Sequence, residues 1–532
     1  MRIRVERNDG MFRVSINEPR PIVKFSFSGV EVSVKELPEE LLILESTSPI
    51  HIRGYEGVKG IIVQRKLGLD EHVYGLGEKA FDLDRRRATY QLWNTDVAAV
   101  TKYGWYIDPM YVNVPFLMIV RKDGVVGYLF NSASRILVDV GMRIYDKLTA
   151  FVPEESLELY IFSGKNVEEV LEKYTELTGR PFLIPEWALG YQISRYSYYP
   201  QDRVLEIVKR HLDNGFKVSV VYLDIDYMDS YKMFTWDSNK FPDPRQLTNE
   251  LHRFGVRVIT IFDPCLRVDQ NYELFKEALG LFVETGKGEI FTGPMWPGVC
   301  AWIDFGNPKA REWWAEKVRD WVSRYGVDGI WLDMNEPAVL GRVTKDSTIE
   351  ETAMHNLSDR RVTHAQFHNA YAYYEAIATQ EGLRRASLEP FILSRAGFAG
   401  IQSFAAVWTG DNIPSWDDLK LQVVLALGLS ISGIPYVGCD LGGFAGRQWG
   451  GVGPTDLDLL VRYYQVALFF PVFRSHGAPD NIDKELYNLP RPWADKVREV
   501  IRLRYEFLPY LSALALEAHE RGHPILRPLV YY

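Results

Sequence analysis

The chain has 532 residues, of which 47% are hydrophobic and 25% charged, so its composition is that of a folded protein and excludes extended disorder. This length predicts two or more domains, one of which has room for a large barrel. The formal net charge of -9 is spread along the chain without a basic stripe, which argues against a nucleic-acid partner.

The N-terminus and the cysteines bear on the cellular compartment. Residues 1–16 contain no apolar core of a signal peptide, and Cys265, Cys300 and Cys439 form neither a CxxC motif nor an even disulfide framework. We therefore expect a reduced, cytoplasmic protein. The longest apolar run, residues 421–438, is interrupted by glycine and proline and is interpreted as a buried helix followed by a buried strand, so no membrane partner is predicted.

The first part of the chain, residues 1–180, consists of short β-rich segments between turn residues. Examples are "RVSINEP" at the start and "ESLELYIFSG" near the end of this part. Many short strands separated by Gly, Pro and Asn are typical of an antiparallel sandwich. We therefore predict an N-terminal β-sandwich, followed by a helix at "NVEEVLEKYTELTG" that leads into the second part.

From residue 181 to 525, apolar runs of strand length alternate with longer amphipathic stretches. Eight such runs occur, from "WALGYQI" near residue 187 to "LFFPVF" near residue 468. Continuous hydrophobicity is typical of strands buried on both faces, so the pattern predicts a (β/α)₈ barrel and a multidomain α/β protein. Long gaps after the third and fourth strands predict inserted subdomains at about 270–300 and 338–385, whereas the gap between the fifth and sixth strands is too short for a normal helix.

Polar side chains follow nearly every predicted barrel strand. Because all strands of a parallel barrel end on one face, these residues are expected to converge there. The ring consists of Asp224, Asp226, Asp263, Asp333, Arg395, Asp411, Asp440 and His476. For any one of them, capping of the next helix or neutralisation of a buried acid is an alternative role.

Two kinds of chemistry suit such a ring. Glycosidic cleavage needs one protonated and one ionised carboxyl group, and flat apolar rings such as Trp296, Trp331, Trp408 and Trp416 match the faces of sugars. The alternative is a divalent metal site, for which Asp224, Asp226, Asp333, Glu336 and Asp440 would supply oxygen ligands. Arg395 and His476 argue against a metal because these cations already offset the acids, so we predict neither a metal nor a cofactor.

The strand ends carry a family resemblance. "GIWLDMNEP" at 329–337 followed by "WTGDN" at 408–412 resembles glycoside hydrolase family 31, and "LDIDYMD", "FTWD", "PMWPG", "LSRAGF", "GCDLGGF" and "FFPVFRSH" match it further, in the family's order. The resemblance implies a retaining, exo-acting enzyme on α-linked glycosides. It implies that Asp333 attacks the anomeric carbon and that Asp411 protonates the leaving oxygen and later deprotonates water.

The resemblance also implies roles around this pair. Asp224, Arg395 and His476 would bind the hydroxyls of the terminal sugar, and Trp296, Trp331, Trp408 and Phe444 would wall the pocket. Further implied members are Ile225 and Asp440 in the pocket, Glu336 as a support behind it, and Asp96 from the sandwich loop "LWNTD".

Within the family, "DIDYM" after the second barrel strand resembles the α-glucosidases. The expected substrates are therefore maltose and malto-oligosaccharides with a terminal α-linked glucose. An α-xylosidase, a transglycosylase of the same family and a non-catalytic glycan-binding protein remain open alternatives, as does a homo-oligomer.

Two further expectations concern the end of the chain and a histidine pair. Relatives usually continue into C-terminal β-sandwich domains, so residues 526–532 are interpreted as the start of a segment that is otherwise absent. His364 and His368 lie four residues apart on a predicted helix, as zinc ligands sometimes do, but no HExxH motif surrounds them. We expect them to lie on a solvated helix face.

Overall fold

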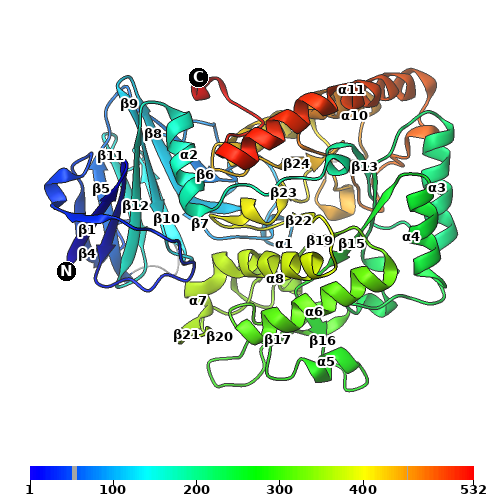
Figure 1. Cartoon of the computed structure of the whole chain (residues 1–532), viewed down its shortest axis with the longest axis horizontal. Helices are drawn as coiled ribbons and strands as arrows, with labels where there is room; N and C mark the ends of the chain where they lie inside the picture. Colours follow the sequence, from blue (N-terminus) through cyan, green and yellow to red (C-terminus); the bar gives the residue numbers. More distant parts are fainter. Residues whose placement is uncertain (51–56, 452) are drawn as a thin grey trace.

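The computed structural model describes residues 1–50, 57–451 and 453–532. Two antiparallel sheets form the N-terminal part, on the left of Figure 1. Within the described residues, the seven-stranded sheet has the order β3-β1-β2-β12-β9-β8-β6 and the five-stranded sheet the order β4-β5-β11-β10-β7. Strand bounds are β1 Ile3–Asn8, β2 Met11–Ile16, β3 Val30–Val32, β4 Leu42–Thr47, β5 Lys59–Lys66, β6 His72–Gly77, β7 Ala88–Leu92, β8 Asn113–Arg121, β9 Gly124–Phe130, β10 Ile136–Val140, β11 Lys147–Val152 and β12 Leu157–Gly164.

The two sheets bury a common apolar layer. Val14 and Leu159 of the first sheet and Ile61 and Val138 of the second belong to one cluster of buried side chains. Alternate residues of an antiparallel strand point to the same face, so each sheet turns one apolar face towards this layer. The predicted β-sandwich is confirmed.

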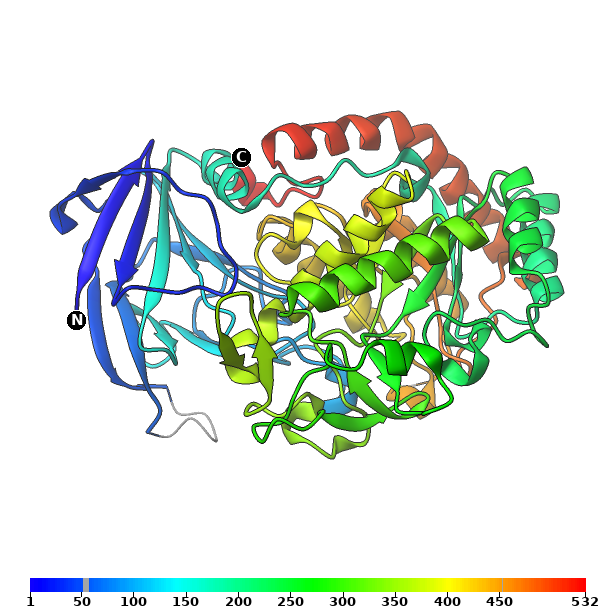
Figure 2. The ribbon, with the colours of Figure 1, turned by 60° about the horizontal axis from the view of Figure 1, so that its bottom comes forward.

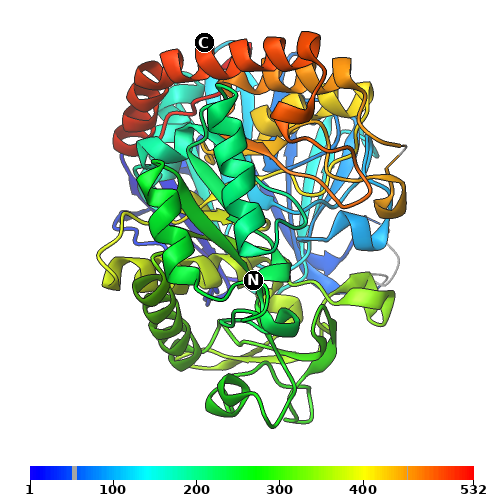
Figure 3. The same ribbon diagram turned by 90° about the vertical axis from the view of Figure 1, so that its right-hand side faces the viewer.

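The second part is a closed parallel barrel, whose strands follow the order of the chain among the described residues. Helices surround the barrel, and Figure 3 shows α3 and α4 side by side on one flank. The strands are β13 Tyr191–Ile193, β14 Val220–Leu223, β15 Arg257–Phe262, β19 Gly329–Leu332, β22 Ile392–Ser394, β23 Ala406–Trp408, β24 Val437–Asp440 and β25 Val472–Ser475. The helices are α3 Gln201–Asp213, α4 Pro244–Arg253, α6 Pro308–Tyr325, α8 Tyr371–Arg385, α9 Trp416–Ser430, α10 Leu457–Val466 and α11 Arg491–Arg521.

The short connection between β22 and β23 holds a single 3₁₀ turn, Ile401–Ser403, where other strands are followed by a helix. The gap between the fifth and sixth predicted strands is short because it holds this turn in place of an α-helix. The predicted (β/α)₈ barrel is confirmed.

Two insertions interrupt the alternation of strands and helices. The first insertion follows β15 and contains α5 Glu273–Glu277 and a small sheet of β16 Cys265–Arg267, β17 Thr292–Met295 and β18 Gly298–Trp302. The second insertion follows β19. It contains the hairpin of β20 Met354–Asn356 and β21 Arg361–Thr363 and the short helix α7 His364–Phe367.

The linker between the two parts is α2, Val167–Thr178. Its start is fixed by Asn166, whose side chain accepts a hydrogen bond from the Glu169 N–H, and by acidic residues in the first turn that favour a helix N-terminus. Figures 1 and 2 both show the C-terminal end of the chain beside α2, after α11 has crossed the barrel. No helix among the described residues is long and apolar enough to cross a membrane.

Candidate active site

The strand ends converge as the barrel geometry requires. A cavity of about 260 Å³ opens where β14, β19, β22 and β25 end, and the side chains of Asp224, Asp333, Arg395 and His476 come directly after these strands. Parallel strands place all their carboxyl ends on one face, which is why these four residues share the cavity although Asp224 and His476 are 252 positions apart. Its lining consists of Asp96, Ala98, Ala99, Thr101, Lys102, Tyr103, Tyr196, Asp224, Ile225, Trp296, Trp331, Asp333, Met334, Leu340, Arg395, Asp411, Ile413, Phe444, Gln448, Gly450 and His476.

Arg395 is the electrostatic centre of the cavity. Its buried guanidinium places Nε 3.1 Å from Asp333 Oδ1 and Nη1 3.7 Å from Asp411 Oδ2. The same group donates two hydrogen bonds to Glu336, Nε to Oε1 at 2.8 Å and Nη2 to Oε2 at 2.9 Å, and approaches Asp96 Oδ2 at 3.5 Å. A planar guanidinium with five donors suits this role because it can serve several carboxylates at fixed angles.

The surroundings separate the two predicted catalytic carboxyls. Burial raises the pKa of both Asp333 and Asp411, and the positive charge of Arg395 opposes this rise at both. The pKa of Asp411 is nevertheless raised well above its ordinary value, because the negative charges of Asp333, Asp96 and Asp440 add to burial. Asp333 lies nearer to the guanidinium and is the carboxyl that stays ionised more easily, so the pair is poised as one anion and one acid.

His476 and Asp224 form a second polar corner of the cavity. His476 Nδ1 lies 2.8 Å from the Ser194 hydroxyl, and its Nε2 lies 3.7 Å from Asp224 Oδ2. Burial lowers the pKa of His476 well below its usual range and raises that of Asp224 well above it, so both groups favour their neutral forms. Phe444 stacks on the imidazole with ring centroids 5.0 Å apart, and the corner therefore combines hydrogen-bonding groups with an apolar face.

Glu336, Trp408 and Asp440 lie behind the lining rather than in it. Glu336 holds Arg395 as described, and burial raises its pKa to about 7. Asp440 accepts a hydrogen bond from Arg474 Nη2 at 2.7 Å. The structure therefore places these residues as supports of the groups that face the cavity.

Arg474 was missed in the sequence, although it stands two residues before His476 in "FFPVFRSH". Its side chain is fully buried, and its guanidinium carbon lies 4.7 Å from the ring centroid of Trp331 and 4.9 Å from that of Trp408. The cation fixes both rings and pairs with Asp440, so it completes the wall beneath the cavity. The feature of the sequence that could have indicated Arg474 was its position in the last barrel strand, β25.

Two further residues of the predicted ring, Asp226 and Asp263, and one predicted tryptophan, Trp416, also lie outside the cavity lining. Asp226 accepts a hydrogen bond from the Tyr231 hydroxyl at 3.2 Å, and Trp416, at the start of α9, is 53% exposed. Asp263 is buried, and neither of its oxygens has a hydrogen-bond partner among the described residues. Burial and the nearby charge of Asp333 raise the pKa of Asp263 well above its usual range, which favours a neutral acid.

One wall of the cavity comes from the sandwich. The loop after β7 leads to Asp96, whose side chain accepts a hydrogen bond from the Ala99 N–H and so begins the short helix α1, Val97–Val100. Six residues of this segment line the cavity: Asp96, Ala98, Ala99, Thr101, Lys102 and Tyr103. Of these, only Asp96 was predicted from the sequence. A four-residue helix within the long loop between β7 and β8 leaves no periodic pattern, so only the motif "LWNTD" indicated this wall.

The predicted exposure of His364 and His368 is wrong, because both rings are fully buried. His364 Nε2 lies 2.9 Å from His368 Nδ1, and Trp93 stacks on His368 with ring centroids 3.5 Å apart. The loop of the sandwich covers this helix face, so a pattern read along one helix could not show its burial. His364 Nδ1 lies 2.9 Å from Nε2 of a third histidine, His355, and His368 Nε2 lies 2.8 Å from the main-chain oxygen of Asn94. Both nitrogens of each ring in the pair thus already have a partner, which leaves none of them for a metal.

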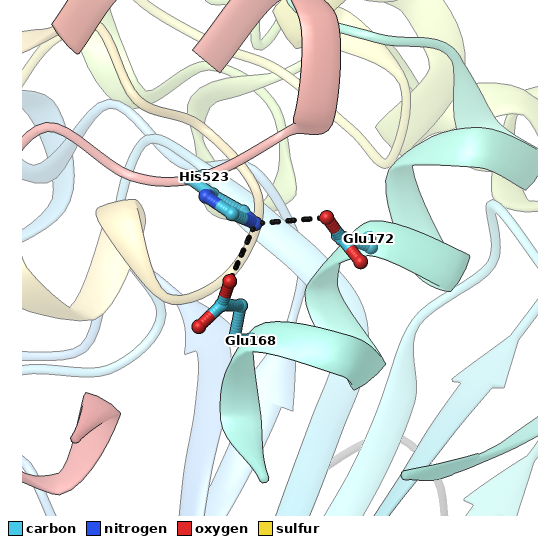
Figure 4. Close-up of side chains that lie close together, drawn as sticks. All are labelled: Glu168, Glu172 and His523. Carbon is cyan, nitrogen blue, oxygen red and sulfur yellow. Dashed lines mark hydrogen bonds and ion pairs between the residues drawn. The ribbon is translucent and has the colours of Figure 1, made fainter. Parts of the chain in front are cut away.

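Among the described residues, one group has the composition of a metal site. Glu168 and Glu172 of α2 face His523, which follows α11, and the ligand atoms lie within 4.8 Å of one another (Figure 4). Arg521 approaches both carboxylates, at 2.6 Å for Glu172 and 3.3 Å for Glu168, so a cation is already present. Neither α2 nor the segment after α11 contributes to the cavity, and the cluster is interpreted as an ion-pair network that joins the chain end to α2.

Most of the chain matches the models of known protein families. Residues 181–514 match the model for the glycosyl hydrolases family 31 TIM-barrel domain, and residues 2–139 match that for the glycosyl hydrolase 31 N-terminal galactose mutarotase-like domain. Both parts of the structure thus match domains of one family, in the same order along the chain.

Individual relatives agree with this match. The chain is 50% identical to an alpha-glucosidase of Saccharolobus solfataricus, over 99% of its own length and 77% of that protein, and 36% identical to alpha-glucosidase 2 of Bacillus thermoamyloliquefaciens, over 94% and 66%. Among solved structures, the glucosidase II alpha subunit with Glc1Man2 bound superposes with a TM-score of 0.79 at 31% identity, covering 89% of this chain and 53% of that one. A family 31 dextranase of Flavobacterium johnsoniae, in a mutant complexed with isomaltotriose, gives 0.85 at 25%, covering 98% and 68%.

Proposed function

The chain belongs to glycosyl hydrolase family 31, and we propose from this premise that it is a retaining, exo-acting α-glucosidase that removes terminal α-linked glucose from maltose and malto-oligosaccharides. The observation that carries the proposal is the single guanidinium of Arg395 within reach of both Asp333 and Asp411 at one small cavity. A cavity of about 260 Å³ suits one terminal sugar ring, which favours an exo-acting enzyme.

In the proposed first step, the Asp333 carboxylate attacks the anomeric carbon while the bond to the leaving oxygen breaks. Asp411 gives its proton to that oxygen, so the departing sugar leaves as a neutral alcohol. The raised pKa of Asp411 supports this role, because a general acid must still hold its proton near the working pH. The product of the step is a glucosyl ester on Asp333.

In the proposed second step, water replaces the ester oxygen at the same carbon. Formation of the ester removes the negative charge of Asp333, which is one of the charges that raise the pKa of Asp411. The pKa of Asp411 therefore falls, and its carboxylate accepts a proton from the attacking water. Two displacements at one carbon return the original anomeric configuration.

The hydroxyls of the bound glucose would be recognised by the polar corner of Asp224 and His476 and by Arg395. Trp331 packs nearly at right angles to His476, with ring centroids 5.2 Å apart, and Phe444 stacks on the imidazole. This combination of polar groups and flat rings fits the alternating hydroxyl edges and apolar faces of a pyranose. Trp296 and Ile225 complete the lining near this corner.

The proposal is tested first on substrates and products. We expect turnover of p-nitrophenyl α-glucoside at least tenfold above that of the α-xyloside, and we expect time-resolved NMR to show α-glucose as the first product from maltose. β-Glucose as the first product would contradict retention, and faster cleavage of the xyloside would favour an α-xylosidase. Activity that is unchanged in EDTA would separate this mechanism from a metal-dependent one.

The roles of the two acids are separated by their response to the leaving group. Asp333→Gly is expected to abolish glucosyl transfer from every substrate. Asp411→Ala is expected to lose about 10²- to 10⁴-fold on maltose but much less on α-glucosyl fluoride, whose leaving group needs no proton. Equal losses of Asp411→Ala on both substrates, measured as kcat/KM, would contradict its assignment as the acid.

A further inference from the structure

A continuous series of hydrogen bonds runs through three buried histidines beside the barrel. It begins at Asp304, whose Oδ1 lies 2.7 Å from His355 Nδ1, and continues from His355 Nε2 to His364 Nδ1 at 2.9 Å. His364 Nε2 lies 2.9 Å from His368 Nδ1, and His368 Nε2 lies 2.8 Å from the main-chain oxygen of Asn94. All three rings are fully buried, so solvent does not compete for these contacts.

The number of protons in this series follows from its two ends. The carbonyl oxygen of Asn94 only accepts hydrogen bonds, and a carboxylate at Asp304 does the same. Each of the four contacts therefore needs one proton between its two atoms, whereas three neutral imidazoles supply only three. The series is complete only with one additional proton.

The surroundings indicate where the additional proton lies. Asp304 also accepts the N–H groups of Gly306 at 3.0 Å and Asn356 at 2.7 Å, so both of its oxygens act as hydrogen-bond acceptors. Burial lowers the pKa of both His364 and His368 well below the usual range, and Arg135 lowers that of His368 further. His355, next to the carboxylate, is then the ring that donates through both nitrogens, to Asp304 and to His364, and His364 and His368 are Nε2–H tautomers.

The far end of the series holds the sandwich loop that enters the active site. Besides the contact from His368, the Asn94 N–H donates to Asn369 Oδ1 at 2.8 Å, and the Asn94 side chain donates to Gly397 O at 3.0 Å. Trp93 lies flat on His368 at an interplanar angle of 7°. Two residues after Asn94 comes Asp96, which approaches Arg395 at 3.5 Å in the cavity.

We propose that Asp304, His355, His364 and His368 share one additional proton and that this proton, by completing the series, holds the loop Trp93–Asp96 in the active site. The histidines are thus positioning residues that act through Asp96 on the substrate. The effect on catalysis rests on the proposed function, but the proton count does not.

The proton count is tested on the unaltered protein by neutron diffraction of deuterium-exchanged crystals. The expected result is one deuteron at each of the four contacts, with His355 carrying two and His364 and His368 carrying theirs on Nε2. A contact without a deuteron, or a rotated ring that breaks the series, would overturn the proposal. This measurement holds even if no glucosidase activity is found.

The positioning role is tested with His364→Phe, which keeps a ring but removes both nitrogens. We expect kcat/KM on maltose to fall about tenfold, and we expect the same substitution in an Asp96→Ala background to cause less than a twofold further loss. Such non-additivity shows that His364 acts through Asp96. Independent, multiplicative losses would overturn the positioning role.

The matched control is His211→Phe. His211 is also buried and also uses both nitrogens, towards Ile207 O and the Leu486 N–H, but it lies on α3 and outside the cavity. We expect it to lower the melting temperature while kcat/KM stays within twofold. If His364→Phe does not fold, the neutron measurement on the unaltered protein still decides the proton count, on which the positioning role depends.

Discussion

Neighbouring charges, rather than burial alone, distinguish the carboxyls of the active site. Asp333 and Asp411 are both half-buried and both lie near Arg395, yet their distances to the guanidinium differ, 3.1 Å against 3.7 Å. Asp96 adds a negative charge that raises the pKa of both. A residue supplied by the sandwich therefore takes part in setting the protonation of the barrel's acids.

The pH profile of Asp96→Asn tests this influence. In the proposed mechanism, kcat/KM falls at low pH when Asp333 is protonated and at high pH when Asp411 loses its proton. Asp96 raises both pKa values, so its neutralisation lowers both, and both limbs of the profile move to lower pH. Asparagine also caps helices, which keeps α1 in place.

The control for this profile is Asp226→Asn, measured over the same pH range. Asp226 bonds to Tyr231, lies outside the cavity lining and is not among the groups that shift Asp333 or Asp411. Its neutralisation should leave both limbs unmoved. A profile of Asp96→Asn that moves upward, or that coincides with the control, would contradict the electrostatic role of Asp96.

At the scale of single elements, the turn after β23 shows how backbone geometry positions Asp411, the side chain proposed as the acid. Gly410 precedes Asp411 and has a φ of +71°, a region that residues with a Cβ rarely adopt. A Cβ at this position would overlap the ring of Tyr111, which is fully buried and has no space to move. The glycine thus permits both the turn and the close approach of the sandwich segment.

Gly410→Ala is therefore expected to destabilise the protein by about 2–4 kcal/mol, from strain in the backbone and overlap with Tyr111. It should also lower kcat/KM on maltose at least tenfold, because Asp411 is the next residue and catalysis is sensitive to small displacements. The control is Gly255→Ala, where φ is +74° but no atom lies within 4 Å of the added Cβ. Calorimetry should show that Gly255→Ala lowers the free energy of unfolding by only about 1 kcal/mol. Equal losses for Gly255→Ala and Gly410→Ala would contradict the role of Tyr111.

The elements also show how far sequence reasoning extends. Continuous apolar runs predicted the barrel strands, and because parallel strands end on one face, Asp224, Asp333, Arg395 and His476 could be placed together from the sequence alone. The same reasoning put Asp226 in the ring, since alternate residues after a strand cannot be distinguished without the local turn. In the structure, the turn directs Asp226 towards Tyr231.

Contacts between distant segments could not be predicted in this way. The burial of His364 and His368 depends on Trp93, which comes from the sandwich about 270 residues earlier in the chain. Likewise, Lys102 reaches the cavity because the segment after α1 crosses the mouth of the barrel. Such contacts leave no periodicity within either segment, so single-sequence patterns contain no signal for them.

At the scale of the whole molecule, α11 closes the barrel seam where the first and last strands pair. Arg504 of this helix is fully buried and donates to three main-chain oxygens, those of Leu189 at 2.7 Å, Leu468 at 2.5 Å and Pro471 at 2.9 Å. Leu189 lies just before β13, and the other two lie just before β25, so one side chain ties both edges of the seam. Burial lowers the pKa of Arg504 to about 9, and the three carbonyl oxygens offset part of the cost of burying its charge.

Arg504→Met is expected to destabilise the molecule by about 3–5 kcal/mol, since three buried carbonyls lose their donors at once. Thermal and urea unfolding should both report this loss, whereas kcat/KM well below the transition should stay within about twofold because the seam lies at the start of the strands, away from the cavity. Arg502→Met is the matched control, two residues earlier on the exposed face, where its ion pairs with Glu499 and Glu506 are solvated and no measurable change is expected. If the two variants unfold at the same temperature, Arg504 does not close the barrel.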